Sequence, residues 1–90
     1  MRSNFSEITD KTQTIWKSYA EPIAFKTADW PLTFRQNDWG VTTASHISKA
    51  RSHEKGWQLG PLSGDWFAYA MIIARDGGTI ADLFSVMNDS

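Results

Sequence analysis

Apolar side chains recur at helical spacing near the start of the chain. The positions, with one threonine among them, are separated mostly by three or four residues and alternate with charged side chains: Phe5, Ile8, Thr12, Ile15, Trp16 and Tyr19. This period is typical of an amphipathic helix that buries one face. We therefore expect a helix over residues 5–19, which Pro22 ends because the residue before a proline avoids the helical conformation.

Two more helices are predicted in the middle of the chain. Residues 29–31 read Asp-Trp-Pro, and proline is favoured at the first position of a helix, so a helix from Pro31 would stop at Gly40. Residues 42–54 carry a thin apolar stripe of alanine and isoleucine at helical spacing and a large polar face. We expect this second segment to be a short helix that Gly56 ends.

The apolar residues after Trp57 allow two interpretations. Residues 57–59 and 66–73 can be two strands joined by a turn-rich linker, or Ser63 or Asp65 can cap a helix over residues 66–75. Several alanines favour the helix, whereas tyrosine and isoleucine favour the strand. We favour the helix, ended by two glycines, and expect a last helix from Ile80 to Met87 that Thr79 caps.

These segments predict one mainly α domain over residues 1–90. We expect four or five short helices around an aromatic core; the alternative interpretation of the residues after Trp57 adds a small wing-like β-hairpin at about residues 57–73. Ninety residues leave no room for a second core.

Composition excludes several classes of protein. Lysine and arginine number 9 and aspartate and glutamate 10, so the net charge of −1 fits neither a histone-like binder nor an acidic nucleic-acid mimic. The absence of cysteine excludes disulfides and thiolate metal sites, and favours the cytoplasm. The longest apolar run, Trp66 to Ala74, is too short to cross a membrane, and the first residues do not resemble a signal peptide.

Charge is distributed unevenly along the chain. Residues 41–64 hold three basic side chains against one acidic side chain, and both histidines lie nearby. Residues 65–90 hold one basic side chain against four acidic ones. A folded chain can present these segments as separate faces, and the basic one is a candidate surface for an anionic partner.

The basic segment carries a motif that points to nucleic acid. A possible tight turn at Gly40-Val41 precedes residues 42–53, whose core reads Ser-His-Ile-Ser-Lys-Ala-Arg, and Lys55-Gly56-Trp57 follows. Residues 35–57 thereby resemble the helix-turn-helix and winged-helix DNA-binding regulators. The resemblance implies that residues 42–53 form a recognition helix in the major groove of double-stranded DNA.

The resemblance also assigns roles to single residues. Short polar side chains would read base edges, and cations would hold phosphates. The DNA-binding residues expected on this basis are Thr43, Ser45, His46, Lys49, Arg51 and Lys55. A homodimer would pair two such helices on a two-fold operator.

Tryptophan supports an alternative function from a different class. Three of the five tryptophans lie near predicted turns beside polar residues: Trp30, Trp39 and Trp57. Tryptophan is enriched at binding hot spots because it buries a large area and keeps one hydrogen-bond donor. The alternative is a small protein-binding module or inhibitor that blocks a larger partner protein through these side chains and its charged faces.

Nothing in the sequence predicts an enzyme, a metal site or a cofactor. His46 and His53 are two helical turns apart, which is too far to share one metal ion. Residues 60–64 only half resemble the Gly-x-Ser-x-Gly motif of hydrolases, and no glycine-rich phosphate loop is found. We therefore expect a binding protein without catalytic residues.

Overall fold

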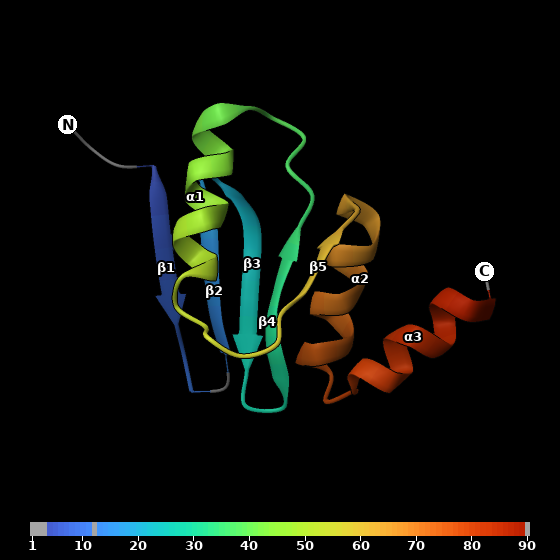
Figure 1. Ribbon diagram of the computed structural model, residues 1–90. Helices are drawn as coiled ribbons and strands as arrows, with labels where there is room; N and C mark the ends of the chain where they lie inside the picture. Colours follow the sequence, from blue (N-terminus) through green and yellow to red (C-terminus); the bar gives the residue numbers. More distant parts are fainter. Residues whose placement is uncertain (1–3, 12, 90) are drawn as a thin grey trace.

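The structure, a computed structural model, describes residues 4–11 and 13–89 (Figure 1). Within these ranges the chain forms a mixed sheet and three helices. The strands are β1 (Phe5–Thr9), β2 (Gln13–Ser18), β3 (Glu21–Thr27), β4 (Trp30–Arg35) and β5 (Leu59–Leu62). The helices are α1 (Val41–Arg51), α2 (Gly64–Arg75) and α3 (Ile80–Asp89).

The strands lie in the sheet in the order in which they occur in the chain. β1 to β4 form an antiparallel meander, and β5 returns through α1 to pair parallel with β4. Gly60 makes this last pairing possible: its φ is +148°, and a Cβ atom there would lie 2.5 Å from the carbonyl oxygen of Phe34. Only glycine lets the two backbones approach so closely.

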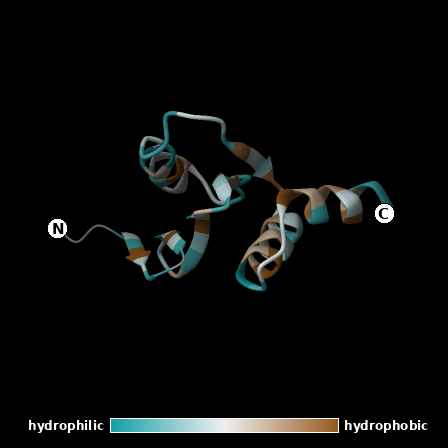
Figure 2. Cartoon of the chain, turned by 90° about the horizontal axis from the view of Figure 1, so that it is seen from below, coloured by the Kyte–Doolittle hydropathy of each residue, from teal (hydrophilic) through white to brown (hydrophobic). Residues whose placement is uncertain are grey.

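Helices cover both faces of the sheet. Figure 2 shows α1 on one side and α2 on the other, with α3 extending beyond α2. The α1 side of the core consists of Trp16, Ile23, Ala24, Leu32, Phe34, Ile47 and Ala50. The α2 side consists of Phe25, Trp30, Leu62, Phe67, Ala70 and Leu83. The arrangement is a layered α/β fold.

The expected mainly α fold is wrong, and the largest error is at the start of the chain. Residues 5–9 and 13–18 form β1 and β2 instead of one helix, and Thr12 of the expected helix lies outside the described residues. Trp16 packs beneath α1, whereas its neighbour Ile15 packs on the opposite side of the sheet. Because both faces of β2 bury apolar side chains, the alternation that marks a half-exposed strand is absent and the spacing imitates a helix.

Two further expectations are wrong. The predicted helix over residues 31–40 does not form: residues 30–35 are strand β4, which is mostly buried, and residues 36–40 are the loop before α1. The predicted hairpin at residues 57–73 contains only β5, because the chain turns into α2 at Gly64.

The other helices are confirmed with small shifts in their bounds. α1 replaces the expected span 42–54, and α2 and α3 replace 66–75 and 80–87. The hydroxyl of Ser63 accepts a hydrogen bond from the backbone N–H of Trp66, as a cap should. At the start of α3, Thr79 and Asp82 form a reciprocal pair in which each side chain accepts from the other's backbone N–H. None of the described helices is long and apolar enough to cross a membrane.

Candidate functional site

A cluster of buried polar side chains joins α1 to the end of β2. The Oγ atom of Ser18 lies 2.6 Å from Nδ1 of His46 and 3.2 Å from Oγ1 of Thr43. All three side chains are buried. Burial, and after it the positive charge of Lys49, lowers the pKa of His46 below its usual value. The cluster is therefore a neutral, hydrogen-bonded link between the two elements at neutral pH.

The residue that follows Ser18 has an unusual backbone conformation. Tyr19 stands in the two-residue turn between β2 and β3 with φ at +59°, the single positive value at a non-glycine residue in the described chain. A bulky side chain costs about 1–2 kcal/mol in this left-handed region, where glycine or asparagine is usual. The side chain is nevertheless 58% exposed. Burial of the ring in the core therefore does not account for this tyrosine.

Trp39 stands across from Tyr19 on the loop before α1. Its indole is half exposed, and the guanidinium of Arg35 lies 4.4 Å from its ring centroid. The Oδ1 atom of Asn37 accepts hydrogen bonds from the backbone N–H groups of Trp39 and Gly40. Arg35 is held in turn by Asp38 at 2.8 Å. The exposed indole is therefore fixed from its backbone and from one ring face.

Two adjoining hollows lie between these aromatic side chains. The first, about 180 Å³, is lined by Ser18, Tyr19, Glu21, Trp39 and Thr43. The second, about 300 Å³, shares three of these residues and extends over the first turn of α1. Val41, at its margin, is 88% exposed. We call the two hollows together the Tyr19–Trp39 groove. The buried Ser18–Thr43–His46 cluster lies beneath it.

Of the six residues expected to contact DNA, two are buried and four are exposed. Thr43 and His46, two of the three expected base readers, face the sheet and are buried. The other four are exposed: Ser45, Lys49, Arg51 and Lys55. The first helix of the expected motif does not form, since residues 30–35 are β4 and residues 36–40 are the loop before α1. Residues 41–51 thus form a helix that packs on one face of the sheet.

Arg51 is engaged within the chain. Its guanidinium carbon lies 4.2 Å from the ring centroid of Phe34, and its Nε donates to Gln58 at 2.8 Å. Lys49 has its ammonium 5.9 Å from the ring of Phe5. These contacts direct both cations along the protein surface.

The three tryptophans expected at an interface also differ in burial. Trp30 is buried in the core, where its indole N–H donates to the carbonyl oxygen of Gly78 at 3.0 Å. Trp39 and Trp57 are exposed, the latter by 62%. Of these two, Trp39 borders the groove, whereas Trp57 follows the C-terminal end of α1. Trp57 is therefore a natural control for the role of Trp39.

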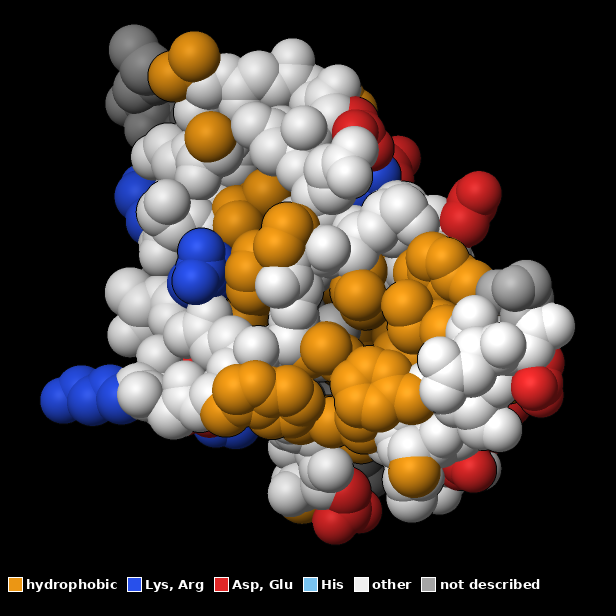
Figure 3. All heavy atoms as spheres, turned by 45° about the vertical axis from the view of Figure 1, so that its right-hand side comes forward, with side chains coloured by type: hydrophobic (Ala, Val, Ile, Leu, Met, Phe, Trp, Pro, Cys, Tyr) orange, Lys and Arg blue, Asp and Glu red, His pale blue; other side chains and the backbone are white. Residues whose placement is uncertain are grey.

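A second apolar surface lies at the C-terminal end of the fold. Figure 3 shows hydrophobic side chains gathered over α2, α3 and the adjoining sheet, with acidic side chains near the margin. Tyr69, Ile72 and Phe84 are its most exposed members. Ile73 and Met87 are partly buried against the core beneath it. Tyr69 of this surface packs edge-on against Trp66, with 6.1 Å between the ring centroids.

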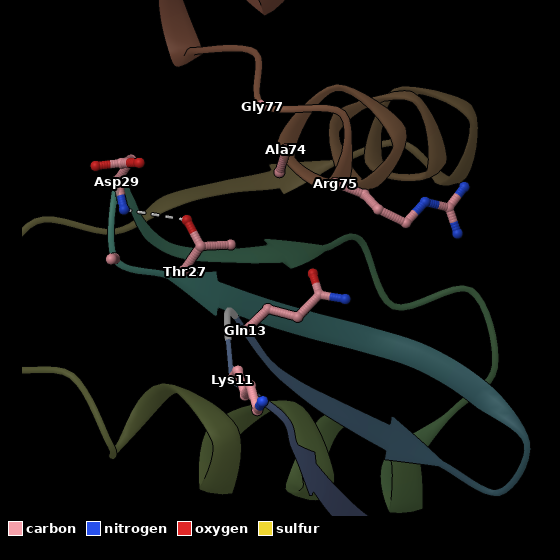
Figure 4. A pocket seen from close by; sticks show the side chains of 8 residues that line it. Lys11, Gln13, Thr27, Asp29, Ala74, Arg75 and Gly77 are labelled. Carbon is pink, nitrogen blue, oxygen red and sulfur yellow. Dashed lines mark hydrogen bonds between the residues drawn. The ribbon is translucent and has the colours of Figure 1, made fainter.

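The third surface is a polar hollow of about 330 Å³ where α2 ends above the β2–β3 strands (Figure 4). Lys11, Asp29 and Arg75 line it, but their charged ends point away from one another. The described residues contain no group of three or more histidine, cysteine, aspartate or glutamate side chains that would hold a metal ion. This hollow therefore lacks a convergent set of ligating groups.

Sequence reasoning identified Trp39 but missed Tyr19 and Ser18. Both were assigned to a continuous helix, in which their neighbours would have been different. A turn signal at Ala20-Glu21-Pro22 was available, yet the residue in the left-handed conformation is a tyrosine, which no turn rule selects.

The protein is a small α/β domain with an aromatic groove above a buried polar cluster. The family follows from the sequence, because residues 1–68 match DUF8033, a family of unknown function. Since the match covers most of the chain, the chain belongs to this family. The match includes the whole groove and its polar cluster and leaves out α3. No curated protein and no solved structure matches the chain.

Proposed function

We propose that this chain is a non-enzymatic protein-binding module that recognises a partner protein at the Tyr19–Trp39 groove. The observation that carries the proposal is the pair of exposed aromatic side chains, one kept in a strained turn and one fixed by its own loop. Strained residues persist where the surroundings impose them and cluster at functional sites. Fixed aromatic side chains bind well because little conformational entropy is lost on association.

The groove also has the composition of a binding hot spot. Tryptophan and tyrosine dominate such sites, and fully desolvated pockets at their centre contribute most of the affinity. The rigid base of the groove comes from α1 and β2, which the Ser18–His46 and Ser18–Thr43 contacts hold together. A partner side chain that enters would meet a preformed surface.

A photo-crosslinking experiment tests the proposal. A benzophenone amino acid is placed at Val41, beside the groove, or at Trp57 as a matched exposed control. A partner that crosslinks at position 41 is then purified, and its affinity is measured by calorimetry for the wild type, Trp39→Ala and Trp57→Ala.

We expect Trp39→Ala to weaken binding by about 30-fold or more, as hot-spot truncations do. Trp57→Ala should leave the affinity within about two-fold. The proposal fails if no crosslinked partner depends on Trp39.

DNA binding stays a prediction, now restricted to the exposed part of α1 and the loop after it. Ser45, Lys49 and Lys55 remain accessible there. The test is fluorescence anisotropy with a duplex of random sequence at about 50 and 200 mM salt, where several phosphate contacts give a steep loss of affinity. Binding that falls steeply and is weakened by Lys49→Ala would favour DNA over the proposed protein partner. Sedimentation of the same sample tests the expected homodimer.

A further inference from the structure

We infer that the occupant of the Tyr19–Trp39 groove is a proline-rich segment of the partner in the polyproline II conformation. This inference rests on the proposed function and adds the chemistry of the partner to it. Aromatic grooves recognise such segments because proline rings pack flat against indole and phenol faces. The polyproline II helix also loses little entropy on binding, because it is preformed in the free peptide.

The shape of the groove suits an extended ligand. Its two hollows adjoin, share Tyr19, Trp39 and Thr43, and are open along the first turn of α1. A polyproline II helix repeats every three residues with a rise of about 3.1 Å per residue, so neighbouring prolines can occupy successive hollows.

The hydrogen-bonding groups of the groove complement proline. A proline residue offers a carbonyl acceptor and lacks a backbone N–H donor. Within the described chain, neither the indole N–H of Trp39 nor the phenol of Tyr19 has a hydrogen-bond partner, so both are free to donate to peptide carbonyls. No side chain caps the first turn of α1 either, which leaves its backbone N–H groups at the second hollow.

Trp39 lines both hollows, and half of its surface is exposed. Arg35 covers one ring face at 4.4 Å and Asp38 compensates its charge. The hydroxyls of Ser18 and Thr43 on the floor of the groove already bond each other within the buried cluster. The groove therefore presents two aromatic faces and free donors, with Glu21 as the acidic group at its margin.

A nuclear magnetic resonance titration of the full chain tests the inference. The ¹⁵N-labelled protein is titrated with an oligoproline of about ten residues and with a Gly-Ser peptide of equal length, which lacks the polyproline II preference. We expect the indole N–H of Trp39 and the amides of residues 40–43 to shift with the oligoproline. Its apparent affinity should exceed that of the Gly-Ser peptide by about ten-fold or more. Trp39→Ala should abolish the shifts and Trp57→Ala should keep them.

Other outcomes overturn the inference and show what replaces it. Equal shifts with both peptides, or none at Trp39 at about 5 mM oligoproline, rule out proline recognition. Shifts confined to Glu7 and Ile8 would indicate that a peptide adds to the exposed edge of β1. If oligoproline fails while the crosslinked partner still requires Trp39, the protein-binding function stands and only the proline chemistry is wrong.

Discussion

The Nδ1 atom of His46 on α1 lies 2.6 Å from the Oγ atom of Ser18 on β2, in a region closed to solvent. This contact crosses from a helix to a strand that are far apart in the sequence. It fixes the N-terminal half of α1 over the hairpin that carries Tyr19. The shape of the aromatic groove therefore depends on a polar contact beneath it.

Replacing Ser18 should destabilise the fold. No buried side-chain nitrogen or oxygen in the described residues lacks a hydrogen-bond partner. Ser18→Ala removes the shared partner of Thr43 and His46, and a buried polar group left unsatisfied costs about 1–3 kcal/mol. Urea unfolding measures the loss. Ser48→Ala, at an exposed serine on α1, should change the free energy of unfolding by less than about 0.5 kcal/mol. Equal effects of the two variants would contradict a structural role for the cluster.

Stability should fall as the pH is lowered from neutral. Burial, followed by the charge of Lys49, holds the pKa of His46 below the ordinary value of 6.5. The unfolded chain then binds a proton more readily than the folded chain. The stabilisation is complete above the unfolded pKa and is lost as the pH falls from that value toward the folded pKa.

The pH effect is checked in two ways. The free energy of unfolding should decline between about pH 7 and pH 5, and His46→Asn should remove most of that slope. The control His53→Gln should retain the slope, because the side chain of His53 is exposed. A ring titration of His46 at or above its usual pKa would contradict the prediction.

Trp30 should behave as a core residue and not as an interface residue. Its indole N–H bonds the carbonyl of Gly78, which ties β4 to the turn between α2 and α3. Trp30→Phe removes that bond and part of a buried ring, so we expect a loss of about 1–3 kcal/mol in a urea titration. Trp57→Phe, at an exposed position, should stay within about 0.5 kcal/mol of the wild type. Comparable losses would place both rings in the core.

The helices in the second half of the chain were accessible to sequence reasoning because their ends carry local signals. Ser63 and Thr79 accept the backbone N–H groups that caps accept. These contacts span only three residues, and no tertiary information is needed to foresee them. The N-terminal boundaries of α2 and α3 are therefore decided locally.

The strands of the sheet could not be predicted from local signals in the same way. Ile15 and Trp16 are adjacent and both pack inward, because each face of β2 contributes to one of the two core clusters. The alternation of polar and apolar positions that identifies a strand disappears under such double coverage. The expected DNA-binding site depended on the same error. Thr43 and His46 would read DNA only if α1 were a recognition helix, but their side chains face β2. Trp39 was found because its loop is marked by polar neighbours and glycine.

The most direct test of the account concerns Tyr19, whose strained conformation we attribute to binding. Tyr19→Gly removes the ring and relieves a φ of +59°. The account predicts that the free energy of unfolding is unchanged or rises by up to about 1 kcal/mol, since glycine adopts this conformation without strain. The affinity for the partner crosslinked at the groove should meanwhile fall by about ten-fold or more. A variant that loses more than about 1 kcal/mol of stability and binds the partner as the wild type does would contradict the account.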